Sequence, residues 1–221
     1  MSTISTCWYR PGAIPAAELR ELAEMFAEVA DDFVPPLTAR EGTTQADLGK
    51  HTTEAAEPGG NHQGGNQPTG NHQGGNQPGG YLESMLRQDM ILCRTEDQAV
   101  GFLSFRSGHS DPRYADLSPC LYVSTVAVRH HHRRRGVADA LYRELFALPA
   151  SMAASVVLRT WSTNAGHLEL LGRLGFTTIL RLEDDRGAGV DTLYLATDRT
   201  KADAVPNLLP GAVRSSICRR P

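Results

Sequence analysis

The sequence has no run of about 20 apolar residues, the length that a membrane-spanning helix requires, and no N-terminal apolar segment that resembles a signal peptide. Cysteine is scarce as well, since Cys7, Cys93, Cys120 and Cys218 include no Cys-x-x-Cys pair. This spacing predicts reduced thiols and argues against a disulfide framework or a zinc site. We therefore expect a soluble, cytoplasmic protein that does not act on a membrane.

Neither sign of charge is in large excess. The formal net charge of −3 and the pI near 6.2 argue against general binding to nucleic acid. The length of 221 residues suits a single α/β domain with a complete core. We assign this domain to residues 1–198 and expect residues 199–221, which are polar and rich in proline, to form a C-terminal tail.

Apolar side chains are almost absent from residues 52–80. Within this segment the sequence NHQGGNQPTG at residues 61–70 is followed by NHQGGNQPGG at residues 71–80. A segment of this composition cannot offset an ordering entropy of about 1–2 kcal/mol per residue. We therefore expect a flexible insertion loop rich in Gly, Asn and Gln, in which His62 and His72 form no metal site.

Periodic apolar residues predict the elements on either side of this insertion. Helical spacing begins at Pro15 and stops at Pro35, and a second helical pattern follows the insertion. Runs rich in β-branched residues, joined by short polar segments, predict two hairpins. The expected helices cover residues 15–33 and 81–88, and the hairpin strands cover residues 90–94, 99–106, 177–182 and 192–196.

The sequence lacks both of the best-known phosphate loops, Gly-x-x-x-x-Gly-Lys-Ser/Thr and Gly-x-Gly-x-x-Gly. It has instead an apolar run at residues 121–128 that predicts a strand, a basic turn at residues 129–135, and helical spacing from Gly136. A helix N-terminus presents unpaired amides and a partial positive charge, and glycine lets a ligand approach them. The pattern therefore predicts a phosphate or pyrophosphate site. Further donors are the guanidinium groups of Arg133, Arg134 and Arg135.

Two patterns in this part of the chain belong together. Arg133-x-x-Gly136-x-Ala138 directly follows the predicted strand, and a second predicted strand at residues 155–160 precedes a helix that opens at Asn164 and closes at Leu174-Gly175-Phe176. Together they resemble the pyrophosphate loop and the Asn, helix, Gly-Phe element of the GNAT superfamily of acetyl-CoA-dependent N-acetyltransferases. The resemblance implies a GNAT-like α/β fold, with a mixed, mostly antiparallel central sheet flanked by helices.

The resemblance also implies acetyl-CoA as the co-substrate. The pantetheine arm would pair with the end of the central strand, a backbone N–H near Val126 would face the acetyl oxygen, and Asn164 would hydrogen-bond the arm. Asn164 is equally a typical helix N-cap, and both roles are compatible. The expected cofactor-binding residues are Val126, Ala127, Val128, Arg133, Arg134, Arg135, Gly136, Val137, Ala138 and Asn164.

No metal is expected. The run His130-His131-His132 precedes the pyrophosphate loop, but consecutive side chains at a turn point in different directions and rarely converge on one ion. Partial protonation of these imidazoles would instead favour binding of the phosphates of the cofactor.

The residue that usually acts as the general acid in this family is replaced in this sequence. Many members place a tyrosine seven residues after the Asn, and here that position is Leu171. A thiol with a pKa near ~8.5 leaves tolerably as a thiolate, so the loss of this acid would slow the reaction rather than abolish it. Tyr122 and Ser124 are the candidate catalytic residues, because alternate residues of a strand face the same side. Tyr122 is equally consistent with ordinary strand packing.

The resemblance favours an N-acetyltransferase that acts on the primary amine of a small molecule. Two alternatives remain: an acyl-CoA-binding sensor or regulatory protein with little catalysis, which Leu171 favours, and a protein or peptide N-acetyltransferase. A homodimer is common among family members and stays open here. Four acids suggest a cationic acceptor. These acids are Asp31, Asp32, Glu41 and Asp111.

Overall fold

The structure is a computed structural model that describes residues 4–34 and 79–200. The expected insertion loop therefore lies almost entirely outside the described residues, as does Glu41. Only the first two residues of the expected tail, Arg199 and Thr200, are described.

The described chain forms a mixed, mostly antiparallel seven-stranded sheet with the strand order β1-β2-β3-β4-β5-β7-β6, as the resemblance implied. Neighbouring strands are antiparallel except for the pair formed by β4 and β5. Both predicted hairpins are present. The strands are β1 (Ser5–Tyr9), β2 (Asp89–Arg94), β3 (Ala99–His109), β4 (Cys120–Val128), β5 (Ser155–Trp161), β6 (Thr177–Leu182) and β7 (Thr192–Asp198).

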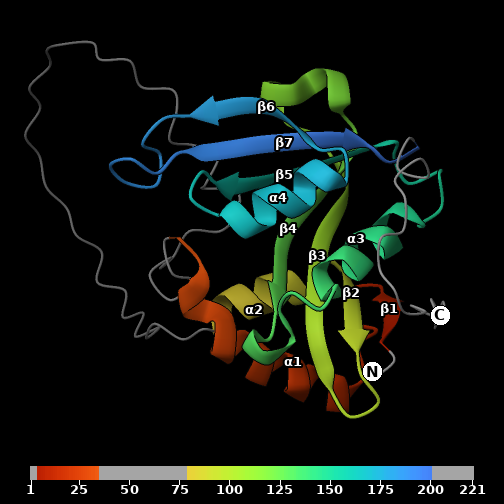
Figure 1. Cartoon of the computed structure of the whole chain (residues 1–221). Coiled ribbons are helices and arrows are strands. Elements are labelled where there is room, and N and C mark those ends of the chain that lie inside the picture. The colour runs from red at the N-terminus through yellow and green to blue at the C-terminus, as the bar shows by residue number, and fades with distance from the viewer. Residues whose placement is uncertain (1–3, 35–78, 201–221) are drawn as a thin grey trace, which may run out of the picture.

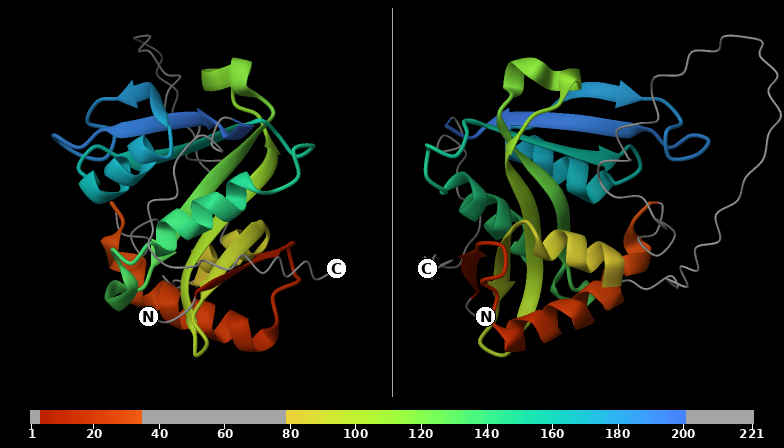
Figure 2. Two further views of the ribbon diagram at one scale, coloured as in Figure 1. Left: turned by 45° about the vertical axis from the view of Figure 1, so that its right-hand side comes forward. Right: turned by 180° about the vertical axis from the view of Figure 1, so that it is seen from behind.

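Helices cover both faces of this sheet (Figures 1 and 2). Helices α1 and α2 pack on one face, where Leu22 and Phe26 join a core with Phe102. Helix α3 packs on the other face, where Leu141 joins a core with Leu103. The helices are α1 (Ala16–Val29), α2 (Gly79–Leu86), α3 (Val137–Phe146) and α4 (Ala165–Arg173), with short 3₁₀ turns η1 (Ala30–Asp32), η4 (Pro112–Leu117) and η5 (His130–His132).

Gly101 on β3 sets how closely α3 approaches the sheet. A Cβ atom at this position would lie 2.6 Å from Val137 Cγ1 and 3.1 Å from the carbonyl oxygen of Ala127. The first distance is shorter than real Cβ contacts and the second is unusually tight, so a larger residue would push α3 away from the sheet. The close approach holds the first turn of α3 beside the end of β4.

Strands β4 and β5 pair over only three residues and then part. Leu121, Tyr122 and Val123 have partners on β5, whereas β4 continues to Val128 beside β3 and β5 continues to Trp161 beside β7. Figure 1 shows the two strands running in different directions after this point. Residues 124–128 of β4 therefore have an edge that no neighbouring strand covers within the described chain.

The chain remains ordered just beyond β7. Arg199, which we assigned to the tail, is only 5% exposed, and it donates hydrogen bonds to the carbonyl oxygens of Leu148 at 2.7 Å and Pro149 at 2.5 Å. These carbonyls follow the C-terminus of α3, where a cation is favourable. Arg199 thus ties the end of β7 to the end of α3.

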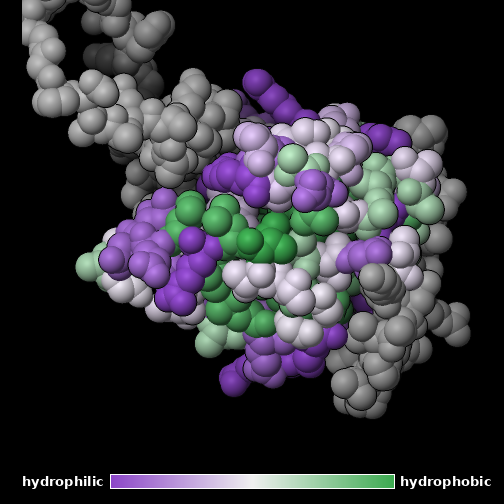
Figure 3. Space-filling model, turned by 90° about the horizontal axis from the view of Figure 1, so that it is seen from above, coloured by the Kyte–Doolittle hydropathy of each residue, from purple (hydrophilic) through white to green (hydrophobic). Residues whose placement is uncertain are grey.

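The surface seen from above carries a band of apolar side chains between polar borders (Figure 3). Among the described residues, the large apolar side chain that is most exposed is Ile179 on β6, at 39%. No helix in the described part of the chain is both long and apolar enough to cross a membrane.

Candidate active site

A cavity of about 1130 Å³ opens where β4 and β5 part. One end is lined by the last residues of β4 and the first turn of α3, and the other by aromatic and arginine side chains of β3, η4, β5 and β7. Nine of the ten expected cofactor-binding residues line it, together with Tyr122 and Ser124. Arg135 is the exception and does not line the cavity.

A β-bulge lies in β4 at the mouth of this opening. Val123 pairs with Phe105 and Thr125 pairs with Ser104, so Ser124 is an extra residue with no partner on β3. The bulge shifts the alternation of the strand. Val123 and then Val126 face the core beneath α3, whereas Tyr122 and Ala127 pack in other clusters. The regular alternation that we assumed for Tyr122 and Ser124 therefore does not hold across this point.

The open edge of β4 exposes the peptide groups of Val126. The N–H of Arg129 donates to the carbonyl of Val100 on β3 at 3.0 Å. Because successive residues of a strand direct their N–H and C=O groups to opposite sides, the groups of Val128 and Val126 point away from β3. Arg133 Nε donates to the carbonyl oxygen of Val128 at 3.2 Å, which agrees with this direction. Val126 is left with a donor and an acceptor on the open edge.

The loop before α3 presents further free amides. Gly136 adopts φ 81° and ψ 4°, a left-handed conformation that favours glycine, and its carbonyl accepts from the N–H of Ala140 at 2.9 Å. Within the described residues no backbone carbonyl accepts a hydrogen bond from the amides of residues 134–138. The first turn of α3 therefore offers a cluster of donors to an anion, as the sequence predicts.

The end of α1 and the η1 turn that follows it hold this loop in place. Arg133 Nη2 is ion-paired with Asp32, whose carboxylate also contacts His130 Nε2 at 2.9 Å. The neighbouring carboxylate of Glu28 bonds Arg129 Nη1 at 2.9 Å. Burial alone would raise the pKa of Asp32, but the hydrogen bonds from His130 and Arg133 outweigh it, so its pKa lies below the usual value. The carboxylate of Asp32 thus already binds side chains of the loop, so we no longer assign it to binding of an acceptor amine.

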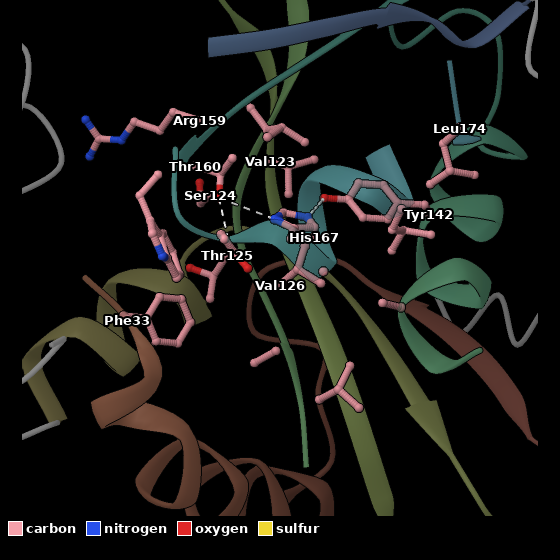
Figure 4. Close-up of a pocket in the computed structure, with 18 of the residues that line it drawn as sticks. Phe33, Val123, Ser124, Thr125, Val126, Tyr142, Arg159, Thr160, His167 and Leu174 are labelled. Carbon is pink, nitrogen blue, oxygen red and sulfur yellow. Dashed lines mark hydrogen bonds between the residues drawn. The ribbon is translucent and has the colours of Figure 1, made fainter. Parts of the chain in front are cut away.

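A second cluster joins α4 to β5 and α3 (Figure 4). Asn164 begins α4, but its side chain makes no capping bond, and its Nδ2 donates to Thr160 Oγ1 at 3.2 Å instead. His167 Nε2 lies 2.9 Å from the hydroxyl of Tyr142, and His167 Nδ1 lies 3.5 Å from Thr160 Oγ1. Burial lowers the pKa of His167 to about 4, so the ring is neutral at pH 7.

The sequence analysis did not single out His167. It lies three residues after Asn164, nearly one helical turn, so both side chains share a face of α4. That spacing is the signal that could have identified it.

The side chain at the position of the family's usual tyrosine does not face the cavity. Leu171 is fully buried in the core beneath α3 and does not line the cavity. Ser124 does line it, and its hydroxyl is buried without a hydrogen-bond partner among the described residues. Tyr122 is 6% exposed, and burial raises the pKa of its phenol. Both candidate catalytic residues therefore face the cavity, while Leu171 contributes no acid to it.

The three consecutive histidines do not converge. His130 contacts Asp32, whereas His132 lines the cavity. In the part of the chain that the structure describes, no group of three or more His, Cys, Asp or Glu side chains could hold a metal ion.

Comparisons with known proteins place this architecture in a family. Residues 72–176 match the acetyltransferase (GNAT) family model. Similar solved structures include the N-acetyltransferase from Staphylococcus aureus Mu50, at 13% identity and a TM-score of 0.54, with 88% of this chain and 98% of that chain covered. Arabidopsis thaliana NAA60, solved with a bisubstrate analogue, is 14% identical with a TM-score of 0.52, and the match covers 87% of this chain and 97% of that chain. A comparison with curated proteins found no match.

The chain therefore carries a GNAT acetyltransferase domain, and the expected GNAT-like fold is confirmed. The match to this family supports an acyltransferase activity, and the GNAT family uses acetyl-CoA.

Proposed function

We propose that this protein transfers the acetyl group of acetyl-CoA directly to the primary amine of a small molecule. The observation that carries this proposal is the continuity of the cavity. Val126, with its open edge, lines the same cavity as Arg134 and residues 136–138, whose amides have no backbone acceptor within the described residues. An extended amide-containing arm fits the edge, and a diphosphate fits the helix N-terminus.

In this proposal, residues of this chain bind the cofactor and stabilise the charge that develops during the reaction. The amides of residues 134–138 and the guanidinium of Arg134 bind the diphosphate, while the N–H of Val126 stabilises charge on the acetyl oxygen as the amine attacks. The new C–N bond forms as the C–S bond breaks, one proton leaves the nitrogen, and the thiolate takes up a proton. Acetyl-CoA supplies the activated acetyl group.

Ser124 and Tyr122 are our candidates for assisting the departing sulfur. The unbonded hydroxyl of Ser124 is free to donate a hydrogen bond, and the raised pKa of Tyr122 keeps its phenol protonated as a donor. Ser124→Ala and Tyr122→Phe should lower kcat and leave the affinity for acetyl-CoA unchanged. Loss of acetyl-CoA affinity in both variants would refute the catalytic assignment.

The test of the function is the release of CoA thiol from acetyl-CoA in the presence of a panel of primary amines, with N-terminal peptides included. Release that depends on a class of small-molecule amines supports the proposal, whereas release with the peptides alone would reject the small-molecule acceptor. The burial of Leu171 favours a second candidate, an acyl-CoA-binding regulatory protein. That candidate predicts tight binding of acetyl-CoA without thiol release for any acceptor.

A further inference from the structure

Positively charged side chains outnumber negatively charged ones in the lining of the cavity. Its lining includes eight arginines and four carboxylates among the described residues, and each of these carboxylates is ion-paired with an arginine that also lines the cavity. The pairs are Asp32 with Arg133, Asp111 with Arg113, Asp139 with Arg143, and Glu169 with Arg173. Of the four acids that suggested a cationic acceptor, Asp32 and Asp111 are neutralised, Asp31 is outside this lining, and Glu41 is outside the described residues.

Two of the remaining arginines, Arg106 and Arg159, have no ion-pair partner in the described part of the chain. Arg106 stacks over the ring of Tyr122 at 4.8 Å, and its Nε is buried with no hydrogen-bond acceptor among residues 4–34 and 79–200. Arg159 lines the cavity from β5, and Figure 4 shows its side chain extending away from Ser124 and His167.

Strand register brings these two side chains to the same end of the cavity. Arg106 is opposite Tyr122 across β3 and β4, and Tyr122 is opposite Val157, two residues before Arg159. Tyr122 precedes Val126 by four residues, or about 13 Å along a strand. The two arginines thus lie on the far side of Val126 from residues 134–138, which separates them from the diphosphate site.

This arrangement is suited to an anion. Guanidinium groups remain protonated and bind carboxylate and phosphate oxygens through paired N–H donors. The rings of Tyr114, Tyr122 and Tyr194 form a cluster at this end and reduce its contact with water, so an uncompensated cation there is costly. A negatively charged ligand group would relieve that cost, whereas a polycationic acceptor would be repelled.

We propose that the acceptor amine also carries an anionic group, a carboxylate or a phosphonate or phosphate, which binds to Arg106 and Arg159. This inference rests on the proposed acetyl transfer and specifies its substrate class. Amino acids and aminoalkyl phosphonates or phosphates are the two sources of this chemistry. In either case the amine is directed toward Val126 while the anion is held at the far end.

The experiment compares acceptors that differ only in the anion. Thiol release is measured for amino acids against their amides, and for aminoalkyl phosphonates against the corresponding alkylamines. We expect kcat/KM to be at least about 10-fold higher for the anionic member of a productive pair. Whether the carboxylates or the phosphonates give the larger ratio identifies the source.

The variants Arg106→Gln and Arg159→Gln should raise the KM for the acceptor, leave the KM for acetyl-CoA unchanged and remove the preference. Arg159→Lys, which keeps the charge, should restore part of the preference. Arg20→Gln is the matched control, because it removes one positive charge from an exposed position on α1. A preference for uncharged amines, or a preference for anions that survives both glutamine substitutions, would overturn the inference.

A binding experiment separates this inference from the proposed function. N-acetyl amino acids and their methylamides are titrated by calorimetry in the presence of CoA. Tighter binding of the acids, lost in Arg159→Gln, supports the anion site even if no amine releases thiol, and that result would reject only the acetyl transfer. Equal binding of acids and methylamides would reject the anion site whatever the turnover.

Discussion

Asp32, in the η1 turn that follows α1, is ion-paired with Arg133, which lies 101 residues further along the chain and begins the loop before α3. The η1 turn thereby fixes the Arg133 side chain, which donates to the Val128 carbonyl. The position of the proposed diphosphate site depends on this contact between distant segments.

Replacing Asp32 by Asn should weaken acetyl-CoA binding roughly 2- to 5-fold, because an exposed ion pair of this kind contributes up to about 1 kcal/mol. Asp31→Asn is the control, since Asp31 is exposed and adjacent but outside the cavity. Calorimetry with acetyl-CoA measures both variants. Because the pKa of Asp32 is lowered, its contribution is present above the ordinary value of 3.8 and is lost as the pH falls through the lowered one. Equal affinities for the two variants would contradict the role of the ion pair.

Replacing Gly136 by Glu should abolish acetyl-CoA binding while the fold is retained. The side chain would enter the anion site with a negative charge, and the left-handed backbone would cost about 1 kcal/mol. Gly12→Glu is a matched control, because Gly12 has φ 78° and a Cβ atom at that position would meet nothing within 4 Å. Both variants should lose similar stability in thermal unfolding, and only Gly136→Glu should lose the cofactor. Unchanged affinity in Gly136→Glu would refute the site.

Replacing Leu171 by Tyr should not restore a general acid. Leu171 is fully buried beside Leu170 and Phe176, so the larger ring would overpack the core at a cost of about 1–3 kcal/mol. We expect a lower melting temperature and no gain in kcat for thiol release. A variant with higher kcat and wild-type stability would show that the phenol reaches the cavity after all.

The neutral state of His167 should make the fold sensitive to mild acid. Its pKa of about 4 lies below the ordinary value of 6.5, so the unfolded chain takes up the proton first and stability falls as the pH drops between these values. The expected loss between pH 7 and pH 5 is about 2 kcal/mol, measured by urea unfolding. His167→Gln should reduce this loss, whereas substitution of the exposed His131 should leave it unchanged. A pH dependence that is identical in His167→Gln would contradict the burial of a neutral ring.

The features that the sequence predicted are those decided by neighbouring residues. The turn at Gly136 and the start of α3 follow from the conformational freedom of glycine and from apolar spacing along one helix face. The end of α4 at Gly175, with φ 81°, is local in the same way. The two hairpins and the sheet of the GNAT domain follow from such patterns together with the resemblance to the family.

Tertiary structure alone decided the rest, because contacts between distant segments determine how each side chain is used. Ser124 is the bulged residue only because of the register between β3 and β4. Asp32 is ion-paired with Arg133, which lies in a distant loop. Arg106 and Arg159 come from different strands, and nothing in the sequence shows that both lack a carboxylate partner within the described residues. Local backbone preference thus determined the loop that we propose for the diphosphate, whereas the three-dimensional pairing of charges determined the character of the end that we propose for the acceptor.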